Sequence, residues 1–196
     1  MNKAKIGVIG AGWWATEFHI PHLKKRNDVE LVSVCKLEQD QLDFVKNKFG
    51  FKFASTDFNE MLEFASLDGV VIATPTSTHY EIATEVLNKN SHVFIEKPIT
   101  TTINEANELI ELAGKNKLFI QVGHIERFNS AFVSLKEKNI NPQFIEIHRL
   151  SSFKSRGHDI SVVLDLMIHD IDIILDIIES EIKDIQANGV KVITSE

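Results

Sequence analysis

The feature that most constrains the fold is a short apolar run ending in a glycine-rich turn near the start of the chain. Residues Lys5 to Ile9 read Lys-Ile-Gly-Val-Ile, and the turn Gly10-Ala-Gly-Trp-Trp-Ala follows at once. Gly10 permits a tight turn, Gly12 lets the backbone approach a pyrophosphate, and Ala15 keeps the following helix close to the strand. The start of that helix offers unpaired N–H groups to phosphates. We therefore predict a dinucleotide site here; a purely structural turn is the alternative.

Short β-branched runs alternate with longer segments of helical period through the first part of the chain. The predicted strands are residues 5–9, 30–35, 69–73, 92–95 and 118–122, and the predicted helices are residues 17–25, 39–49, 78–87 and 104–113. Alternation of this kind implies parallel strands joined by helical crossovers. Strands that are apolar at nearly every position imply helices on both faces. We predict a doubly wound parallel sheet, a Rossmann fold of the α/β class, over residues 1–122.

The pattern changes from residue 123 onward. A helix is predicted over residues 126–137, an alternating strand over 144–150, a helix over 161–178 and a last strand over 182–192. Alternation of apolar and polar residues is typical of an antiparallel sheet with one solvated face. Residues 123–196 are therefore predicted to form a second, α+β part of the chain with a mostly antiparallel sheet.

Composition excludes several classes of function. The chain has 196 residues and a formal net charge of −7, which argues against a nucleic-acid partner or an anionic membrane surface. No apolar run approaches the roughly 20 residues of a membrane span, and the N-terminus lacks a signal peptide, so we expect a cytoplasmic protein. The single cysteine, Cys35, allows neither an internal disulfide nor a thiolate zinc site.

The end of the second predicted strand bears on the choice of nucleotide. An acidic residue is typical there in folds that bind the ribose 2′-hydroxyl, but this chain has Lys36. A cation suits a 2′-phosphate, so NADP is slightly favoured over NAD. Glu38 is near enough to reach a hydroxyl instead, and Lys36 is otherwise a solvated surface residue.

Further motifs follow the glycine turn in order. They are Ala-Thr-Pro-Thr-Ser-Thr-His over residues 73–79, Glu-Lys-Pro over 96–98, Gly-His-Ile-Glu-Arg-Phe-Asn over 123–129, and Asp-Leu-Met-Ile-His-Asp-Ile-Asp over 165–172. Together the chain resembles the Gfo/Idh/MocA family of NAD(P)-dependent oxidoreductases. Members of that family have a C-terminal domain that shapes the substrate pocket and often the oligomer interface, and that is usually at least twice as long as residues 123–196. The resemblance therefore implies that residues 123–196 are the start of this substrate and oligomerisation domain, and we predict that the chain is truncated or fragmentary.

The resemblance implies three catalytic residues. Lys97 is expected to hydrogen-bond the reacting hydroxyl and the cofactor, and its ammonium would stabilise an alkoxide. Asp165 and His169 are four residues apart and share one face of a helix. His169 is expected to be the general acid/base, and Asp165 to orient the substrate or the ring. The alternative is an ordinary helix with a solvated acidic stripe.

The resemblance also extends the cofactor site beyond the glycine turn. Further cofactor-binding residues are expected at Trp13, Trp14, Thr74, Pro75, His79, Glu96 and Lys97. The two tryptophans could serve packing alone, and the segment around Thr74 could be only a turn with a helix cap.

Several neighbouring polar residues have open roles. Arg127 either meets a substrate group or pairs with Glu126 or Glu96, and Asp172 is a candidate partner of His169. A metal site built from His124, Asp165 and His169 is disfavoured, because the family transfers hydride without a metal. Four more basic residues could face the pocket, although a solvated face is favoured; they are Arg149, Lys154, Arg156 and His158.

The sequence thus predicts an NAD(P)-dependent dehydrogenase that acts on a secondary alcohol of a sugar, cyclitol or nucleotide sugar. Two alternatives remain: a non-catalytic sensor that reads NAD(P)H, and a cofactor-binding fragment that is inactive because it is short. An unfinished second sheet would also expose an edge and an apolar face, which favours a homo-oligomer.

Overall fold

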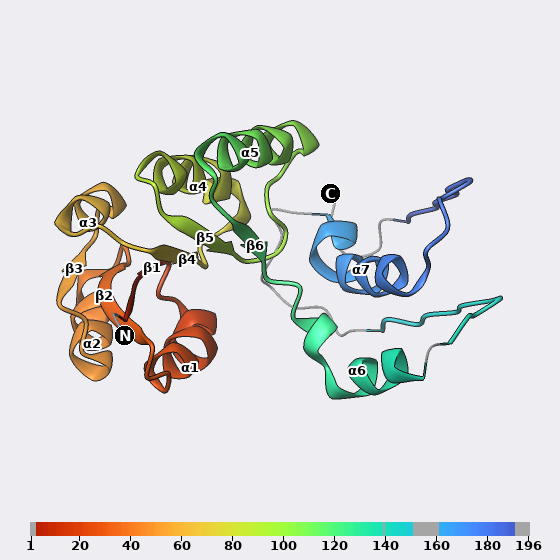
Figure 1. Ribbon diagram of the computed structural model, residues 1–196, viewed down its shortest axis with the longest axis horizontal. Coiled ribbons are helices and arrows are strands. Elements are labelled where there is room, and N and C mark those ends of the chain that lie inside the picture. Colours follow the sequence, from red (N-terminus) through yellow and green to blue (C-terminus); the bar gives the residue numbers. More distant parts are fainter. Residues whose placement is uncertain (1–2, 139, 151–160, 191–196) are drawn as a thin grey trace.

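The protein, described as a computed structural model over residues 3–138, 140–150 and 161–190, is built on one parallel sheet (Figure 1). Its six strands lie in the order β3-β2-β1-β4-β5-β6, and each neighbouring pair is parallel. The strands are β1 (Ala4–Ile9), β2 (Val29–Cys35), β3 (Phe53–Ser55), β4 (Gly69–Ile72), β5 (His92–Ile95) and β6 (Ile120–Val122). The predicted doubly wound sheet is confirmed. Its strand order reverses between β1 and β4, which places a ligand crevice at their carboxyl ends.

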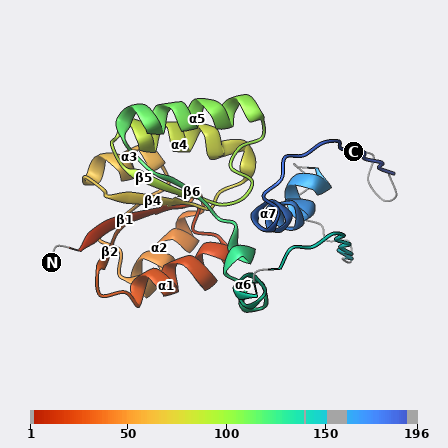
Figure 2. The same cartoon turned by 45° about the vertical axis from the view of Figure 1, so that its right-hand side comes forward.

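Helices cover both faces of this sheet (Figure 2). The π-helical turn Ala15–His19, α1 (Ile20–Lys24) and α2 (Gln39–Phe49) lie on one face. On the other face lie α3 (Phe58–Phe64), α4 (His79–Asn88) and α5 (Ile103–Asn116). Within the described residues, no helix combines the length and the apolar character needed to cross a lipid bilayer.

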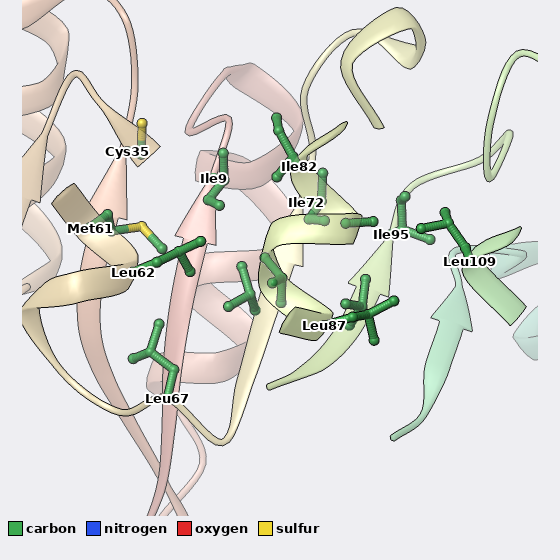
Figure 3. Close-up of a cluster of buried hydrophobic side chains, with 14 of the residues drawn as sticks. Ile9, Cys35, Met61, Leu62, Leu67, Ile72, Ile82, Leu87, Ile95 and Leu109 are labelled. Atoms are coloured by element: carbon green, nitrogen blue, oxygen red, sulfur yellow. The ribbon is translucent and has the colours of Figure 1, made fainter. Parts of the chain in front are cut away.

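Two apolar clusters hold the layers together because neighbouring strand residues point to opposite faces. Val8 packs with the α1 and α2 side, whereas the adjacent Ile9 packs with the α3, α4 and α5 side. Figure 3 shows the second cluster, in which Ile72 and Ile95 from the strands meet Leu87 of α4. Each fully buried aliphatic side chain contributes about 1.5–3 kcal/mol. Packing of the helices on both faces therefore holds the strands, and with them the carboxyl edge of the sheet, in place.

Part of one sheet face is not covered by any helix among the described residues. An apolar groove of about 670 Å³ runs across β4, β5 and β6 on the α1 side. Its wall includes Phe18, Val71 and Phe94. The layer of α1 and α2 thus covers only the half of that face formed by the first strands.

Local sequence signals explain where the longer helices begin and end. The Thr102 hydroxyl accepts a hydrogen bond from the Glu105 backbone N–H, and the Glu105 carboxylate accepts one from the Thr102 N–H, which is a capping box at the start of α5. Helix α2 ends at Gly50, whose φ of +80° is the left-handed conformation that glycine adopts at little cost.

The sequence analysis did not identify β3 and α3. Strand β3 has only three residues, too few to show a period, and α3 has seven. The start of α3 does carry a signal, because the Asp57 carboxylate accepts a hydrogen bond from the Asn59 backbone N–H. Tertiary packing against β2 decides these two elements.

After β6 the chain forms helices but no strand in the part that the structure describes. A 3-10 turn (Ile125–Phe128) precedes α6 (Ser130–Glu137), and a π-helical turn (Val163–Met167) precedes α7 (Ile168–Ile177). The predicted helices are confirmed, with a break at Asn129. The strands predicted over 144–150 and 182–192 are not formed within residues 140–150 and 179–190. This prediction was wrong there because a strand needs a hydrogen-bonded neighbour, and neither segment has one in the part of the chain that the structure describes.

We expect Gly10→Ala to lower the free energy of unfolding by about 1–3 kcal/mol, the usual cost of a strained backbone. Gly10 has a φ of +88°, and a Cβ there would lie 2.6 Å from the Ala73 backbone. Gly12→Ala is the matched control, since no atom lies within 4 Å of a Cβ at that position. Urea unfolding measures both changes; equal stability of the two variants would contradict the prediction.

Candidate active site at the carboxyl edge of the sheet

The glycine turn packs tightly on one side and is open on the other. On the tight side, Gly10 lies against the backbone of Ala73 at the end of β4, and Ala15 is fully buried. On the open side, the backbone at Gly12 has free space above it. A bare, accessible backbone beside a helix start is the shape required to bind a pyrophosphate. The residues present therefore fit a dinucleotide.

Lys97 and Asp165, distant in the sequence, are in direct contact. The Lys97 Nζ donates a hydrogen bond to Asp165 Oδ1 at 2.9 Å and another to the Asp165 carbonyl oxygen at 2.7 Å. Lys97 follows β5, and Asp165 lies in the π-helical turn before α7, which sits beside the sheet (Figure 2). Two of the three residues predicted as catalytic are thus brought together at the predicted edge.

His169 lies one helical turn beyond Asp165, on α7. Burial, followed by the positive charges of Lys97 and Arg149, lowers the pKa of its imidazole below the ordinary histidine value. Its Nδ1 atom is buried and has no hydrogen-bond partner among the described residues. The lowered pKa favours the neutral form of the ring, and the neutral imidazole is the form that can accept a proton.

The two tryptophans of the glycine turn have different surroundings. The Trp14 Nε1 donates a hydrogen bond to Glu96 Oε1 at 2.9 Å. Trp13 is 60% exposed and packs against Phe18 in a T-shaped arrangement. Trp14 therefore ties the turn to the end of β5, whereas Trp13 is free to meet a ligand.

Glu96 also contacts His19, a residue that the sequence analysis did not single out. The His19 Nε2 lies 2.6 Å from Glu96 Oε1. Burial alone would raise the pKa of the Glu96 carboxyl, but the hydrogen bonds from His19 and Trp14 outweigh it, and the pKa is lowered. Only the π-helical turn between Trp14 and His19 brings them to one carboxylate, and no sequence pattern marked such a turn.

The loop after β4 is held by its own polar residues. The Thr78 hydroxyl donates to the Thr74 Oγ1 at 2.9 Å. His79 is buried, with its ring nitrogens facing the carbonyl oxygens of Thr74 and Pro98. Thr74 and Pro75 lie beside the glycine turn, as predicted, because β4 is the neighbour of β1.

At the end of β2 the two residues that bear on nucleotide choice are paired with each other. The Lys36 Nζ lies 2.9 Å from a Glu38 carboxylate oxygen. The Lys36 side chain is mostly buried, and that of Glu38 is exposed. Lys36 is therefore not a freely solvated lysine.

Arg127 binds neither Glu126 nor Glu96, its two predicted protein partners. Its guanidinium makes a two-point contact with the Asp172 carboxylate, at 2.7 and 2.8 Å, and a further bond to Asp176 at 3.2 Å. These bonds attach α7 to the segment that leaves β6. Because α7 carries His169, the pairing also holds the imidazole at the site.

Of the four basic residues named with the pocket in the sequence analysis, one is in the described part of the chain. Arg149 pairs with Asp170 of α7 at 2.6 Å. Lys154, Arg156 and His158 lie outside the described residues. Within the described ranges, no group of three or more His, Cys, Asp or Glu side chains is placed to hold a metal ion.

A family model described as oxidoreductase family, NAD-binding Rossmann fold, matches residues 4–124, which is more than half of the chain. The chain belongs to the Gfo/Idh/MocA family. Its residues 4–124 are the NAD-binding Rossmann domain of that family. The resemblance inferred from the motifs is thus confirmed.

Relatives with assigned activities align with much of the chain. The UDP-N-acetylglucosamine 3-dehydrogenase of Acidithiobacillus ferrooxidans is 40% identical over 67% of this chain and 42% of the relative. The myo-inositol 2-dehydrogenase of Thermotoga maritima is 29% identical over 98% of this chain and 60% of the relative. A solved structure of the Acidithiobacillus ferrooxidans enzyme matches with a TM-score of 0.88 and 33% identity, over 99% of this chain and 62% of that one. The chain spans about half the length of these curated relatives.

We expect Lys97→Met to raise the pKa of His169. The Lys97 charge is one cause of the lowered pKa, so its removal favours the imidazolium form. A pH titration of the ring Cε1–H signal by NMR, assigned with His169→Gln, measures the change. Lys89→Met is the control, because Lys89 pairs with Glu63 on α3; an unchanged or lower His169 pKa in Lys97→Met would refute the prediction.

Proposed function

We propose that this chain carries the cofactor site and the catalytic edge of an NAD(P)-dependent dehydrogenase. Its substrate would be a secondary alcohol of a sugar, cyclitol or nucleotide sugar. The observation that carries the proposal is the contact of Lys97 with Asp165, next to the glycine turn. His169 lies beside this contact, and its lowered pKa favours the neutral imidazole. The named activities of the relatives support this class of substrate. Residues 123–196 would begin the domain that binds the substrate.

Each catalytic residue would have one role in the oxidation. A bound nicotinamide supplies the hydride acceptor. A ring nitrogen of His169 takes the hydroxyl proton, since its lowered pKa keeps the ring neutral. The Lys97 ammonium donates to the reacting oxygen and stabilises the developing alkoxide. Asp165 orients Lys97 through the bond at 2.9 Å.

The cofactor would lie over the glycine turn and along the carboxyl edge. Gly10, Gly12 and Ala15 shape the phosphate site. Trp13, Thr74, Pro75 and Lys97 would contact the nucleotide, and Glu96 would act by holding Trp14 in place through its bond at 2.9 Å. Lys36 would give NADP a small advantage over NAD, reduced by the nearby Glu38.

Titration of the protein with NADH and NADPH, followed by nicotinamide fluorescence, tests cofactor binding. We expect saturable binding, with NADPH slightly preferred, and a loss of at least about tenfold in affinity for Gly12→Val, equivalent to about 1.4 kcal/mol. A side chain at Gly12 would occupy the open backbone face. Gly114→Val is the control, because Gly114 is also in open space but lies in α5.

Two further results of this titration are informative. Lys36→Gln should weaken NADPH binding and leave NADH unchanged, since only NADPH has the 2′-phosphate. Equal binding of both nucleotides before and after that substitution would contradict the role of Lys36. Absence of binding in the unsubstituted protein would overturn the proposed function.

Oxidation of UDP-N-acetylglucosamine or myo-inositol, followed as NAD(P)H absorbance, tests the chemistry. We expect Lys97→Ala to reduce turnover on the order of 10²-fold or more, because it removes the donor to the developing oxyanion. Asp165→Ala and His169→Ala should be similarly impaired, whereas Lys89→Ala should not. Unimpaired variants would refute the assignment, and cofactor binding without turnover of any polyol would favour the non-catalytic alternatives.

A further inference from the structure

His79 is a buried polar side chain that joins two loops of the candidate site. It is the first residue of α4 and is only 1% exposed. Its Nε2 lies 3.0 Å from the Thr74 carbonyl oxygen, in the loop after β4. Its Nδ1 lies 2.9 Å from the Pro98 carbonyl oxygen, in the loop after β5. One imidazole thus bridges two neighbouring loops at the carboxyl edge.

The chemistry of these contacts leaves the ring no capacity for a ligand. A carbonyl oxygen only accepts hydrogen bonds, so each contact requires an N–H on the ring. A neutral imidazole donates to one of the two oxygens, and a doubly protonated ring donates to both. In either form both ring nitrogens face the protein backbone, and burial separates them from the surface where a nucleotide would lie.

The two bridged loops carry different parts of the site. Thr74 and Pro75 belong to the first, and Lys97 directly precedes Pro98 in the second. Lys97 in turn holds Asp165 of the turn before α7. The last backbone bond between β4 and β5 runs from the Glu96 N–H to the Ile72 carbonyl oxygen at 3.0 Å. Beyond it, the His79 ring bridges the Thr74 and Pro98 carbonyl groups, and so bears on how the first loop lies relative to Lys97.

We propose that His79 is a positioning residue that holds the Thr74 loop and the Lys97 loop in register without touching the cofactor. This inference rests on the proposed function, because the register matters only if a nicotinamide lies between these loops. It changes the role expected from the sequence, in which His79 lined the cofactor site itself.

The glycine turn does not depend on this bridge. Gly10 N–H donates to the Cys35 carbonyl oxygen at 3.0 Å, and Trp14 is anchored on Glu96. Glu96 itself is held by the β4–β5 ladder, because its N–H donates to the Ile72 carbonyl oxygen at 3.0 Å. The Ala73 N–H donates to the Ile9 carbonyl oxygen at 2.9 Å, which continues the β1–β4 ladder before the loop begins. The pyrophosphate half of the site therefore keeps its own supports when His79 is changed.

This difference makes the proposal testable by calorimetric titration with two ligands, NADH and ADP-ribose. ADP-ribose has the adenosine and the pyrophosphate but lacks the nicotinamide. We expect His79→Ala to weaken NADH binding about fivefold or more while ADP-ribose binding changes less than about twofold. A side chain with a merely structural role would weaken both ligands alike.

Two conservative variants guard against simple loss of folding. His79→Asn keeps a donor near the Nδ1 position, and His79→Gln keeps one near Nε2. Each should restore part of the NADH affinity. His92→Ala is the matched control. His92 is the first residue of β5 and so lies at the opposite edge of the sheet, and its ring accepts a hydrogen bond from the Phe119 backbone N–H.

The outcomes separate this proposal from the function on which it rests. NADH and ADP-ribose binding unchanged in His79→Ala would overturn it, as would equal weakening of both ligands. Unfolding of all three His79 variants, seen by circular dichroism, would also overturn it, because the ring would then support the whole domain. If the unsubstituted protein bound neither ligand, the proposed function would fall first and the inference with it.

Discussion

The close contact between the turn after β1 and the end of β4 is the constraint on which the rest of the site depends. Gly10 approaches the Ala73 backbone so closely that no side chain fits between them. This contact fixes where β1 and β4 end relative to each other, at the point where the strand order reverses. Because parallel strands all finish at one edge, the loops after β1, β4 and β5 meet there.

Polar side chains then set the arrangement of these loops. Glu96 receives bonds from Trp14 and His19, so the end of β5 is tied to the glycine turn. Lys97, the next residue, contacts Asp165 in the turn before α7, and Arg127 binds α7 itself through Asp172. Of these two adjacent residues, Glu96 therefore contacts the glycine turn and Lys97 contacts the turn before α7. The site depends on charged pairs at its rim and on apolar packing beneath it.

The parallel sheet and its crossover helices were readable from the sequence wherever a segment was long or strongly periodic. Strands β1, β2, β4 and β5 and helices α2, α4 and α5 were predicted close to their observed bounds. Strand β3 was too short to show a pattern. The alternating segment over 144–150 has a strand pattern but no neighbouring strand within the described residues. Periodicity in the sequence shows which side of a strand or helix a residue faces. Whether a strand finds a hydrogen-bonded neighbour depends on the tertiary structure.

For the site, the motifs shared with the family indicated the kinds of residue: a glycine turn, a lysine after β5, and an aspartate and a histidine four residues apart. Their approximate place follows from local spacing, since one turn or one strand end decides it. Only the tertiary structure decided their partners. The bonds of Lys97 to Asp165, Arg127 to Asp172 and His19 to Glu96 join residues that lie far apart in the chain. No local pattern encodes such pairs, because they form only when packing brings separate elements to the same edge of the sheet.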